Sequence, residues 1–87
     1  MHNFIFQLTV VYGIEVNSVS KAYPENVFDQ QPVITDTVGG TPVQLEKTGE
    51  GKIAVTNLQT HEEIVPIRLF CFAWASFHPD TELYSIN

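Results

Sequence analysis

Apolar and polar residues alternate through the first part of the chain, which predicts β-strands. A two-residue loop at Asn17–Ser18 is expected to reverse the chain, because asparagine tolerates the positive φ that such a loop needs. This register pairs Ile14 with Lys21, so that Lys21 lies on an apolar face of the hairpin. One face of the strand predicted over residues 4–16 then carries Val10, Tyr12, Ile14 and Val16, and the other carries Val11, Gly13 and Glu15.

A second hairpin is predicted around Gly39–Gly40, in the stretch "ITDTVGGTPV". The glycines lead into more strand and not into a helix, so a phosphate-binding loop is not indicated. The register pairs Asp36 with Val43, which makes Asp36 the single charge on an apolar face. Pro42 falls in a pair whose N–H would not bond across the hairpin, so its missing donor costs nothing there.

Shorter strands are expected to follow. The turn at residues 48–52 would set Lys47 opposite Ile53. The stretch "EEIVPI" predicts a short strand that Pro66 confines to a sheet edge or a strand end. A last short strand is predicted from "TELYSI".

Two segments are predicted to be helical. In residues 24–30, Pro24 suits the first position of a helix and Pro32 prevents its continuation. Residues 67–77 fit either helical or strand periodicity, and we favour a helix because the run is long, contains alanines and ends before Pro79. Such a helix would be apolar on nearly every side and would form an interface through Phe70, Phe72, Trp74 and Phe77.

These elements predict an α+β fold in one domain over residues 1–87: a twisted antiparallel sheet of about five to seven strands that carries both helices. The hydrophobic fraction of 44% is sufficient for a packed core. The apolar stretch at residues 1–12 lacks the basic region and cleavage site of a signal peptide, and we interpret it as strand.

The chain is acidic, with ten Asp and Glu residues against four Lys and Arg and a formal charge of −6. Four dispersed cations cannot form a basic patch, so nucleic acids and anionic membrane surfaces are not expected as partners. No run approaches the roughly 18 apolar residues that span a membrane. The single cysteine, Cys71, rules out an internal disulfide and favours a reducing, cytoplasmic location.

Few residues carry candidate chemistry. His2, His61 and His78 have no metal-ligand spacing, and we expect neither a metal nor a cofactor. Cys71 lies in the most apolar segment, where a thiol behaves as a small inert hydrophobe. The serines occur in no strained nucleophile motif.

The remaining candidates are Lys21, Asp36, His78 and Asp80. An unpaired charge on an apolar face is costly, so Lys21 and Asp36 should each have a partner. One interpretation is structural: Asp36 accepts bonds from the Gly-Gly turn, Lys21 extends to the sheet edge, and His78 with Asp80 caps the last helix. The other is a ligand pocket in which Lys21 binds an anion and Asp36 or His78 acts as acid or base.

Four stretches resemble a bacterial family known as domain of unknown function 3179: "VYGIEVN", "KAYP", "ITDTVGGTPV" and "FAWASFHPDTELY". The resemblance runs from Val11 to Tyr84. It implies a tight hairpin where longer members have glycine at the position of Ser18, and it implies an amphipathic helix before His78. Those members carry a Cys-Pro-x-x-Cys-type segment that is missing here, so its metal or redox chemistry is not carried over. This chain looks like a minimal version of the domain, of a kind that also occurs in mobile gene cassettes.

Three functions are compatible with these observations. The leading hypothesis is a non-enzymatic interaction module that forms a homo-oligomer through its apolar helix or a strand edge. The second is an enzyme or small-molecule-binding domain centred on Lys21, Asp36, His78 and Asp80. The third is an accessory fragment whose chemistry resides in longer relatives.

Overall fold

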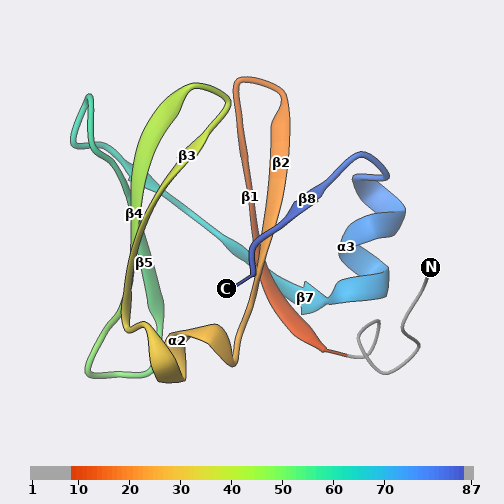
Figure 1. Ribbon diagram of the computed structural model, residues 1–87, viewed down its shortest axis with the longest axis horizontal. Coiled ribbons are helices and arrows are strands. Elements are labelled where there is room, and N and C mark those ends of the chain that lie inside the picture. The colour runs from red at the N-terminus through yellow and green to blue at the C-terminus, as the bar shows by residue number, and fades with distance from the viewer. Residues whose placement is uncertain (1–8, 86–87) are drawn as a thin grey trace.

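Two β-sheets packed face to face make up most of the protein (Figure 1). The computed structural model describes residues 9–85, of which 51% are in strands and 14% in helices. We call the two sheets A and B. Sheet A has the order β7 (Ile67–Phe70), β1 (Val10–Val16), β2 (Val19–Pro24) and β8 (Glu82–Leu83). Sheet B has the order β3 (Val33–Val38), β4 (Thr41–Lys47), β5 (Ile53–Asn57) and β6 (Glu63–Ile64).

Two short helices complete the fold. Helix α2 (Val27–Gln30) lies in the connection from sheet A to sheet B, and helix α3 (Cys71–Phe77) follows β7 directly. Figure 1 shows α3 beside sheet A, on the side away from sheet B. Neighbouring strands are antiparallel except β2 and β8, which are parallel.

The predicted hairpin registers are confirmed. Ile14 pairs with Lys21 across the first hairpin, and Asp36 pairs with Val43 across the second. Lys47 pairs with Ile53 across the next turn. The short strand before Pro66 is β6, which lies at the edge of sheet B as expected, and β8 supplies the predicted last strand.

The main hydrophobic core fills the space between the sheets. Because side chains alternate along β1 and β2, one set of them points toward sheet B. Apolar side chains of sheet B point toward sheet A and pack against this set, and residues of α2 cover one end of the core. The buried members are Tyr12, Ile14, Tyr23, Val27, Phe28, Ile34, Val38, Val43, Leu45, Ile53 and Val55.

A smaller core lies on the opposite face of sheet A. The indole of Trp74 in α3 packs there against Val11 and Ala22 and is 1% exposed. Its ring lies so close to Gly13 that a Cβ at that position would overlap it. The Trp74 Nε1–H donates to Thr81 Oγ1 at 2.7 Å. Sheet A is therefore covered on both faces.

The tips of the first two hairpins contact each other. Asn17 and Ser18 adopt positive φ angles of 52° and 67°, as a tight two-residue loop requires. The Asn17 side chain donates to the Gly39 carbonyl at 2.9 Å and to Thr41 Oγ1 at 3.1 Å. Gly39 is needed because a Cβ there would overlap the Val16 carbonyl. The double glycine thus serves packing between the hairpins as well as chain reversal.

The predicted α+β class is wrong, because the chain is predominantly β and has no long apolar helix. There are eight strands in the described residues, arranged in two sheets and not in one. Residues 4–8 of the strand predicted over 4–16, and residues 1–8 of the apolar stretch 1–12 that was interpreted as strand, lie outside the described residues.

The helix predicted at 67–77 is corrected to β7 followed by α3. Residues Ile67–Phe70 pair with Gly13–Val10 on the free edge of β1, which satisfies backbone groups that a helix would have left unpaired there. The pairing between β7 and β1 ends at the bond from the Cys71 N–H to the Thr9 carbonyl, at 2.7 Å. Helix α3 begins at Cys71. Edge pairing outweighed local helical preference in the first half of the segment.

The helix predicted at 24–30 is shorter than expected. Pro24 ends β2 opposite Val11, and the Glu25 N–H still donates to the Val10 carbonyl at 2.8 Å. Pro24 therefore occupies a pair that needs no donor, so it continues the strand instead of starting a helix. Only Val27–Gln30 are helical.

Candidate functional site

Lys21 and Asp36, two of the four candidate residues, form an ion pair between the sheets. Lys21 Nζ on β2 lies 2.7 Å from Asp36 Oδ2 on β3, and the side chains are 15% and 21% exposed. Each charge lies on the inner, apolar face of its sheet, as the alternation predicted. Each is the partner that the other requires.

Asp36 also accepts two further hydrogen bonds. The Tyr23 hydroxyl donates to Asp36 Oδ2 at 2.9 Å, and the Thr37 N–H donates to Asp36 Oδ1 at 2.8 Å. Burial alone would raise the pKa of Asp36, but the bonds from Lys21, Thr37 and Tyr23 together with the Lys21 charge hold it below its ordinary value of 3.8. Asp36 is therefore ionised at neutral pH.

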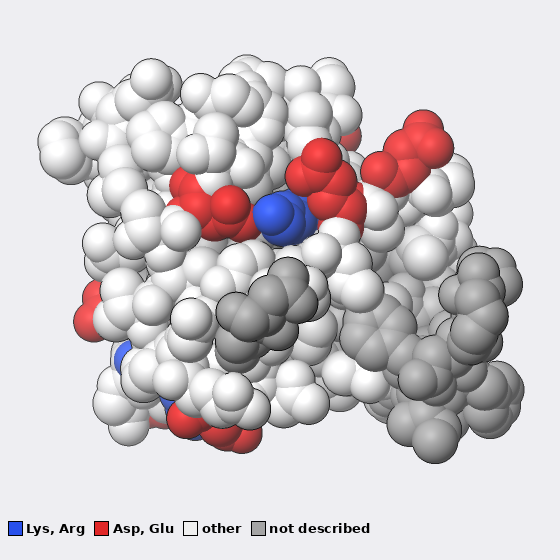
Figure 2. All heavy atoms as spheres, viewed as in Figure 1, with Lys and Arg blue, Asp and Glu red and all other residues white. Residues whose placement is uncertain are grey.

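Tyr23 and Tyr84 enclose this ion pair. Their rings are tilted against each other with centroids 5.3 Å apart, and Lys21 Nζ lies 5.8 Å from the Tyr23 centroid and 5.6 Å from that of Tyr84. Tyr84 is held by a bond from its hydroxyl to Gln31 Oε1 at 2.7 Å. On the face of the molecule that Figure 2 shows, a basic side chain lies near the middle with acidic side chains beside it.

The two tyrosines were not among the predicted site residues. Tyr23 could have been found, because it follows Lys21 by two positions and so lies on the same face of β2. Tyr84 carried no such signal. It reaches the pair because the Tyr84 N–H donates to the Ala22 carbonyl at 2.9 Å, where β8 lies beside β2.

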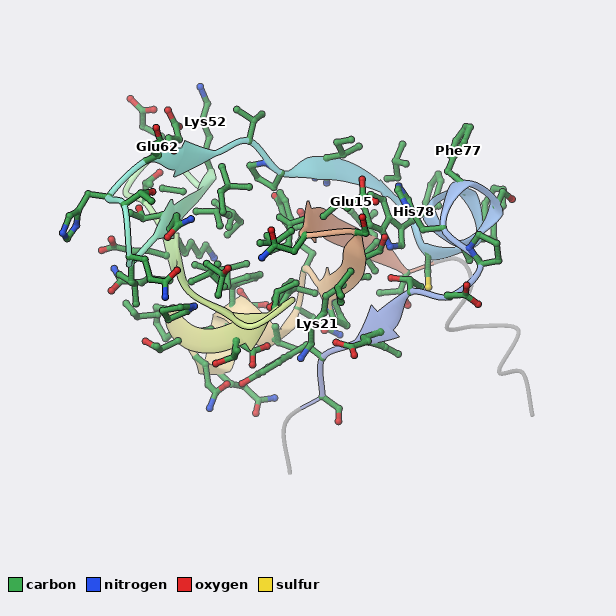
Figure 3. All side chains as sticks on the ribbon, turned by 90° about the horizontal axis from the view of Figure 1, so that it is seen from above. Glu15, Lys21, Lys52, Glu62, Phe77 and His78 are labelled. Atoms are coloured by element: carbon green, nitrogen blue, oxygen red, sulfur yellow. The ribbon has the colours of Figure 1, made fainter. Side chains whose placement is uncertain are left out.

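His78 lies on the other side of sheet A. Its Nδ1 is 2.9 Å from Ser20 Oγ, and its ring packs on Trp74 with centroids 4.0 Å apart. Ser20 and Lys21 are consecutive in a strand, so their side chains point to opposite faces. Figure 3 accordingly shows His78 apart from Lys21. His78 ends α3, its N–H bonding the Trp74 carbonyl, so the cap expected of His78 is present, but Asp80 contributes no bond to it among the described residues.

Asp80 is exposed and makes no hydrogen bond or ion pair with any residue between 9 and 85. The structure therefore brings Lys21 and Asp36 together, and leaves His78 and Asp80 elsewhere. A ligand-binding role for these four residues stays a prediction.

The Lys21–Asp36 pair is suited to joining the sheets. Among the described residues, the polar side-chain groups of Lys21, Asp36, Tyr23 and Tyr84 all have partners. Burial, followed by the bond to Asp36, raises the pKa of Tyr23, so that its hydroxyl keeps its proton. A general acid or base needs a group that can exchange a proton near neutral pH. Neither the lowered pKa of Asp36 nor the raised pKa of Tyr23 provides one.

The predicted interface residues divide into buried and exposed ones. Trp74 belongs to the smaller core, whereas Phe70, Phe72 and Phe77 are 50%, 49% and 75% exposed. The rings of Phe70 and Phe72 stack with centroids 5.9 Å apart. Figure 3 shows Phe77 projecting from α3 away from the sheets. We use the name β7–α3 surface for these three phenylalanines together with two further exposed apolar residues of the same segment: Val65, Ile67, Phe70, Phe72 and Phe77.

No cluster of three or more His, Cys, Asp or Glu side chains within residues 9–85 is arranged to hold a metal ion. In the same part of the chain, no helix is both long enough and apolar enough to cross a membrane. Burial raises the pKa of the Cys71 thiol. The thiol form therefore predominates at neutral pH.

Comparison with known proteins gives no match: no family model fits the chain, and no similar curated protein or solved structure was found. The likeness to domain of unknown function 3179 rests on the sequence motifs alone. Functional evidence must come from the geometry of this chain.

Proposed function

We propose that the protein is a non-enzymatic interaction module that forms a homo-oligomer through the β7–α3 surface. The observation that supports this is the run of large exposed apolar side chains between Val65 and Phe77, two of them more than 70% exposed. Large exposed apolar side chains are typical of sites of protein association, and the stacked rings of Phe70 and Phe72 provide one continuous apolar contact area among them. The aromatic rings would supply rigid contact area at little entropic cost.

The distribution of charge favours a second copy as the partner. Residues 65–77 contain none of the ten acidic residues of the chain, and Arg68 is their single charge. Two copies of a protein with net charge −6 repel each other over most of their surfaces. The segment that carries the β7–α3 surface adds no negative charge to this repulsion and offers exposed apolar side chains for contact.

The position of β7 gives the contact a defined geometry. Among the described strands, β7 is one of the two edge strands of sheet A and pairs on one side only, with β1. An unpaired strand edge bonds readily to an antiparallel copy of itself about a two-fold axis. We expect Phe70 and Phe72 to pack across that axis.

Light scattering coupled to size-exclusion chromatography tests this proposal with the full chain at micromolar concentration. The wild-type protein should elute with the mass of a dimer or a higher oligomer. The substitutions Phe72→Ser and Phe77→Ser should each weaken association by about tenfold or more, as expected when an aromatic contact is lost from the centre of an interface.

Val33→Ser is the matched control, because Val33 is similarly exposed, at 51%, but belongs to β3 in sheet B. It should leave the mass unchanged. A wild-type monomer at these concentrations would refute the proposal, and so would equal weakening by Val33→Ser and Phe72→Ser. Circular dichroism confirms that each variant is folded.

Two further proposals follow from the sequence. The motifs from Val11 to Tyr84 support membership of the family domain of unknown function 3179, and the confirmed hairpin registers are compatible with it. The single, partly buried thiol of Cys71 supports a reducing location such as the cytoplasm.

A further inference from the structure

We propose that a pocket at the α2 end of the molecule binds a small organic cation, a protonated amine attached to an apolar body. The pocket measures about 270 Å³ and is lined by residues of β1, α2, β4 and β5 and of the adjoining loops. Helix α2 lies at the end of the molecule opposite the tips of the first two hairpins (Figure 1). This volume is just below the roughly 300–1,000 Å³ typical of ligand sites, so a small metabolite fits and a nucleotide does not.

The pocket has an apolar floor built from both sheets and α2. Tyr12, Phe28 and Ile53 line it and are each less than 9% exposed. The rings of Tyr12 and Phe28 meet edge to face, with centroids 6.0 Å apart, which fixes their orientation. A preformed aromatic and aliphatic floor suits the apolar part of a ligand.

The rim of the pocket carries charges of both signs, in pairs. Tyr12 Oη and Arg68 Nε donate to Glu25 Oε2 at 3.3 and 3.0 Å. Lys47 Nζ donates to Asp29 Oδ1 at 3.2 Å. In each carboxylate, the second oxygen has no hydrogen-bond partner among residues 9–85, although both residues line the pocket.

This arrangement favours a cation over an anion. An ammonium group can donate to the free oxygens of Glu25 and Asp29 without breaking either ion pair, and the adjacent Tyr12 ring favours positive charge. An anion would have to compete with Asp29 for Lys47, the one cation among the lining residues, or with Glu25 for Arg68, which lies outside the lining. The net charge of −6 further attracts cations to the molecule.

Three probes with the same apolar body separate the alternatives: phenethylammonium, neutral 2-phenylethanol and anionic 3-phenylpropionate. Each is titrated into the ¹⁵N-labelled full chain at pH 7 and followed by two-dimensional NMR. Phenethylammonium should shift the amide signals of Phe28, Asp29, Gly51 and Ile53 saturably. It should bind about tenfold more tightly than the other two probes, because charge-assisted bonds are the stronger ones.

Substitutions on the rim then assign the charge that matters. Glu25→Gln should weaken phenethylammonium binding by about fivefold, whereas Glu15→Gln, which removes an exposed carboxylate near the hairpin tips, should change it less than about twofold. Lys47→Gln should strengthen ammonium binding by about threefold, since it removes a competing cation. The Glu25–Arg68 pair is exposed, so these variants should stay folded.

Several outcomes would overturn the proposal. Equal affinity for the three probes would mean that only the apolar floor binds, and tighter binding of 3-phenylpropionate would assign the site to anions. Weaker ammonium binding in Lys47→Gln would show that Lys47 does not compete with the ligand for Asp29, which contradicts the proposed arrangement. The absence of saturable shifts up to about 20 mM, where a millimolar binder is saturated, would exclude the site. None of these results depends on the oligomeric state.

Discussion

The close approach of Trp74 to Gly13 shows how a single residue determines where α3 docks. No other residue type would let the indole lie against β1, since any Cβ at position 13 would overlap the ring. The hydrogen bond from Trp74 to Thr81 holds the indole on its other side. The sequence alone could not reveal this, because a glycine inside a strand is explained equally well by a bulge or a weak point.

Gly13→Ala should therefore destabilise the protein by about 1–3 kcal/mol, the usual effect of overpacking a core. Trp74 is the only tryptophan, so denaturant unfolding followed by tryptophan fluorescence reports on this contact directly. Gly49→Ala is the control, because a Cβ there would meet nothing within 4 Å, and it should change stability by less than about 0.5 kcal/mol. Equal effects of the two substitutions would contradict the proposed role of Gly13.

The ion pair between Lys21 and Asp36 should make stability depend on pH in the acidic range. Because the folded state lowers the pKa of Asp36 below 3.8, the unfolded state binds more protons between the two pKa values. The contribution of Asp36 is therefore complete above an unfolded-state pKa of about 3.9 and is lost as the pH falls through the lower, folded-state pKa.

Asp36→Asn should reduce the free energy of unfolding by about 2–4 kcal/mol at pH 7, since it leaves a largely buried Lys21 without its charged partner. The difference from wild type should shrink when urea denaturation is repeated below about pH 4. Asp80→Asn removes the same charge from an exposed site and should have almost no effect. A difference between Asp36→Asn and wild type that does not change with pH would show that Asp36 acts without its charge.

Much of this ion pair could be predicted from the sequence, and some could not. Strand alternation placed Lys21 and Asp36 on apolar faces and required each to have a partner. That they partner each other depends on which face of sheet A packs against which face of sheet B. This is a long-range property, and the alternation within one hairpin does not determine it. The contribution of Tyr84, which directly follows a strand of two residues, could not be predicted by local reasoning either.

At the scale of elements, the hairpins were predictable, and so were the ends of the two helices, but the residues at which the helices begin were not. A two-residue loop and its flanking alternation determine the register locally, so Asn17–Ser18 and Gly39–Gly40 were sufficient. Residues 67–70 became a strand because a free edge of β1 was available, and that edge lies more than 50 positions away in the chain. Tertiary pairing overrode local preference in that segment.

A substitution in the first hairpin loop should increase the stability of the protein. Ser18 has a φ of 67°, a conformation that is unfavourable for residues with a Cβ and natural for glycine. Ser18→Gly should therefore stabilise the protein by about 0.5–1 kcal/mol, measured as a shift in the midpoint of chemical denaturation. Ser20→Gly, in the middle of β2, should destabilise it instead. A loss of stability in Ser18→Gly would show that the serine side chain has a role in the loop.

At the scale of the whole molecule, the acidic charge should oppose the proposed self-association. Raising the salt concentration from about 0.01 M to about 0.15 M shortens the screening length from about 30 Å to about 8 Å, which weakens repulsion between copies but not apolar contact. The dissociation constant of the oligomer should therefore fall by about threefold or more over this range, as measured by sedimentation equilibrium. Weaker association at higher salt would indicate an interface held by ion pairs instead.

The order of the strands along the chain has a consequence for biosynthesis. All four strands of sheet B, β3 to β6, are consecutive along the chain, and they can pair as soon as residue 64 has left the ribosome. Sheet A starts first but is finished last, because its outer strands β7 and β8 and the tryptophan that covers it all come from residues 67–83. Until then the first hairpin has two bare edges and an uncovered face. A nascent chain that stalls in its last quarter would therefore be the species most prone to aggregate.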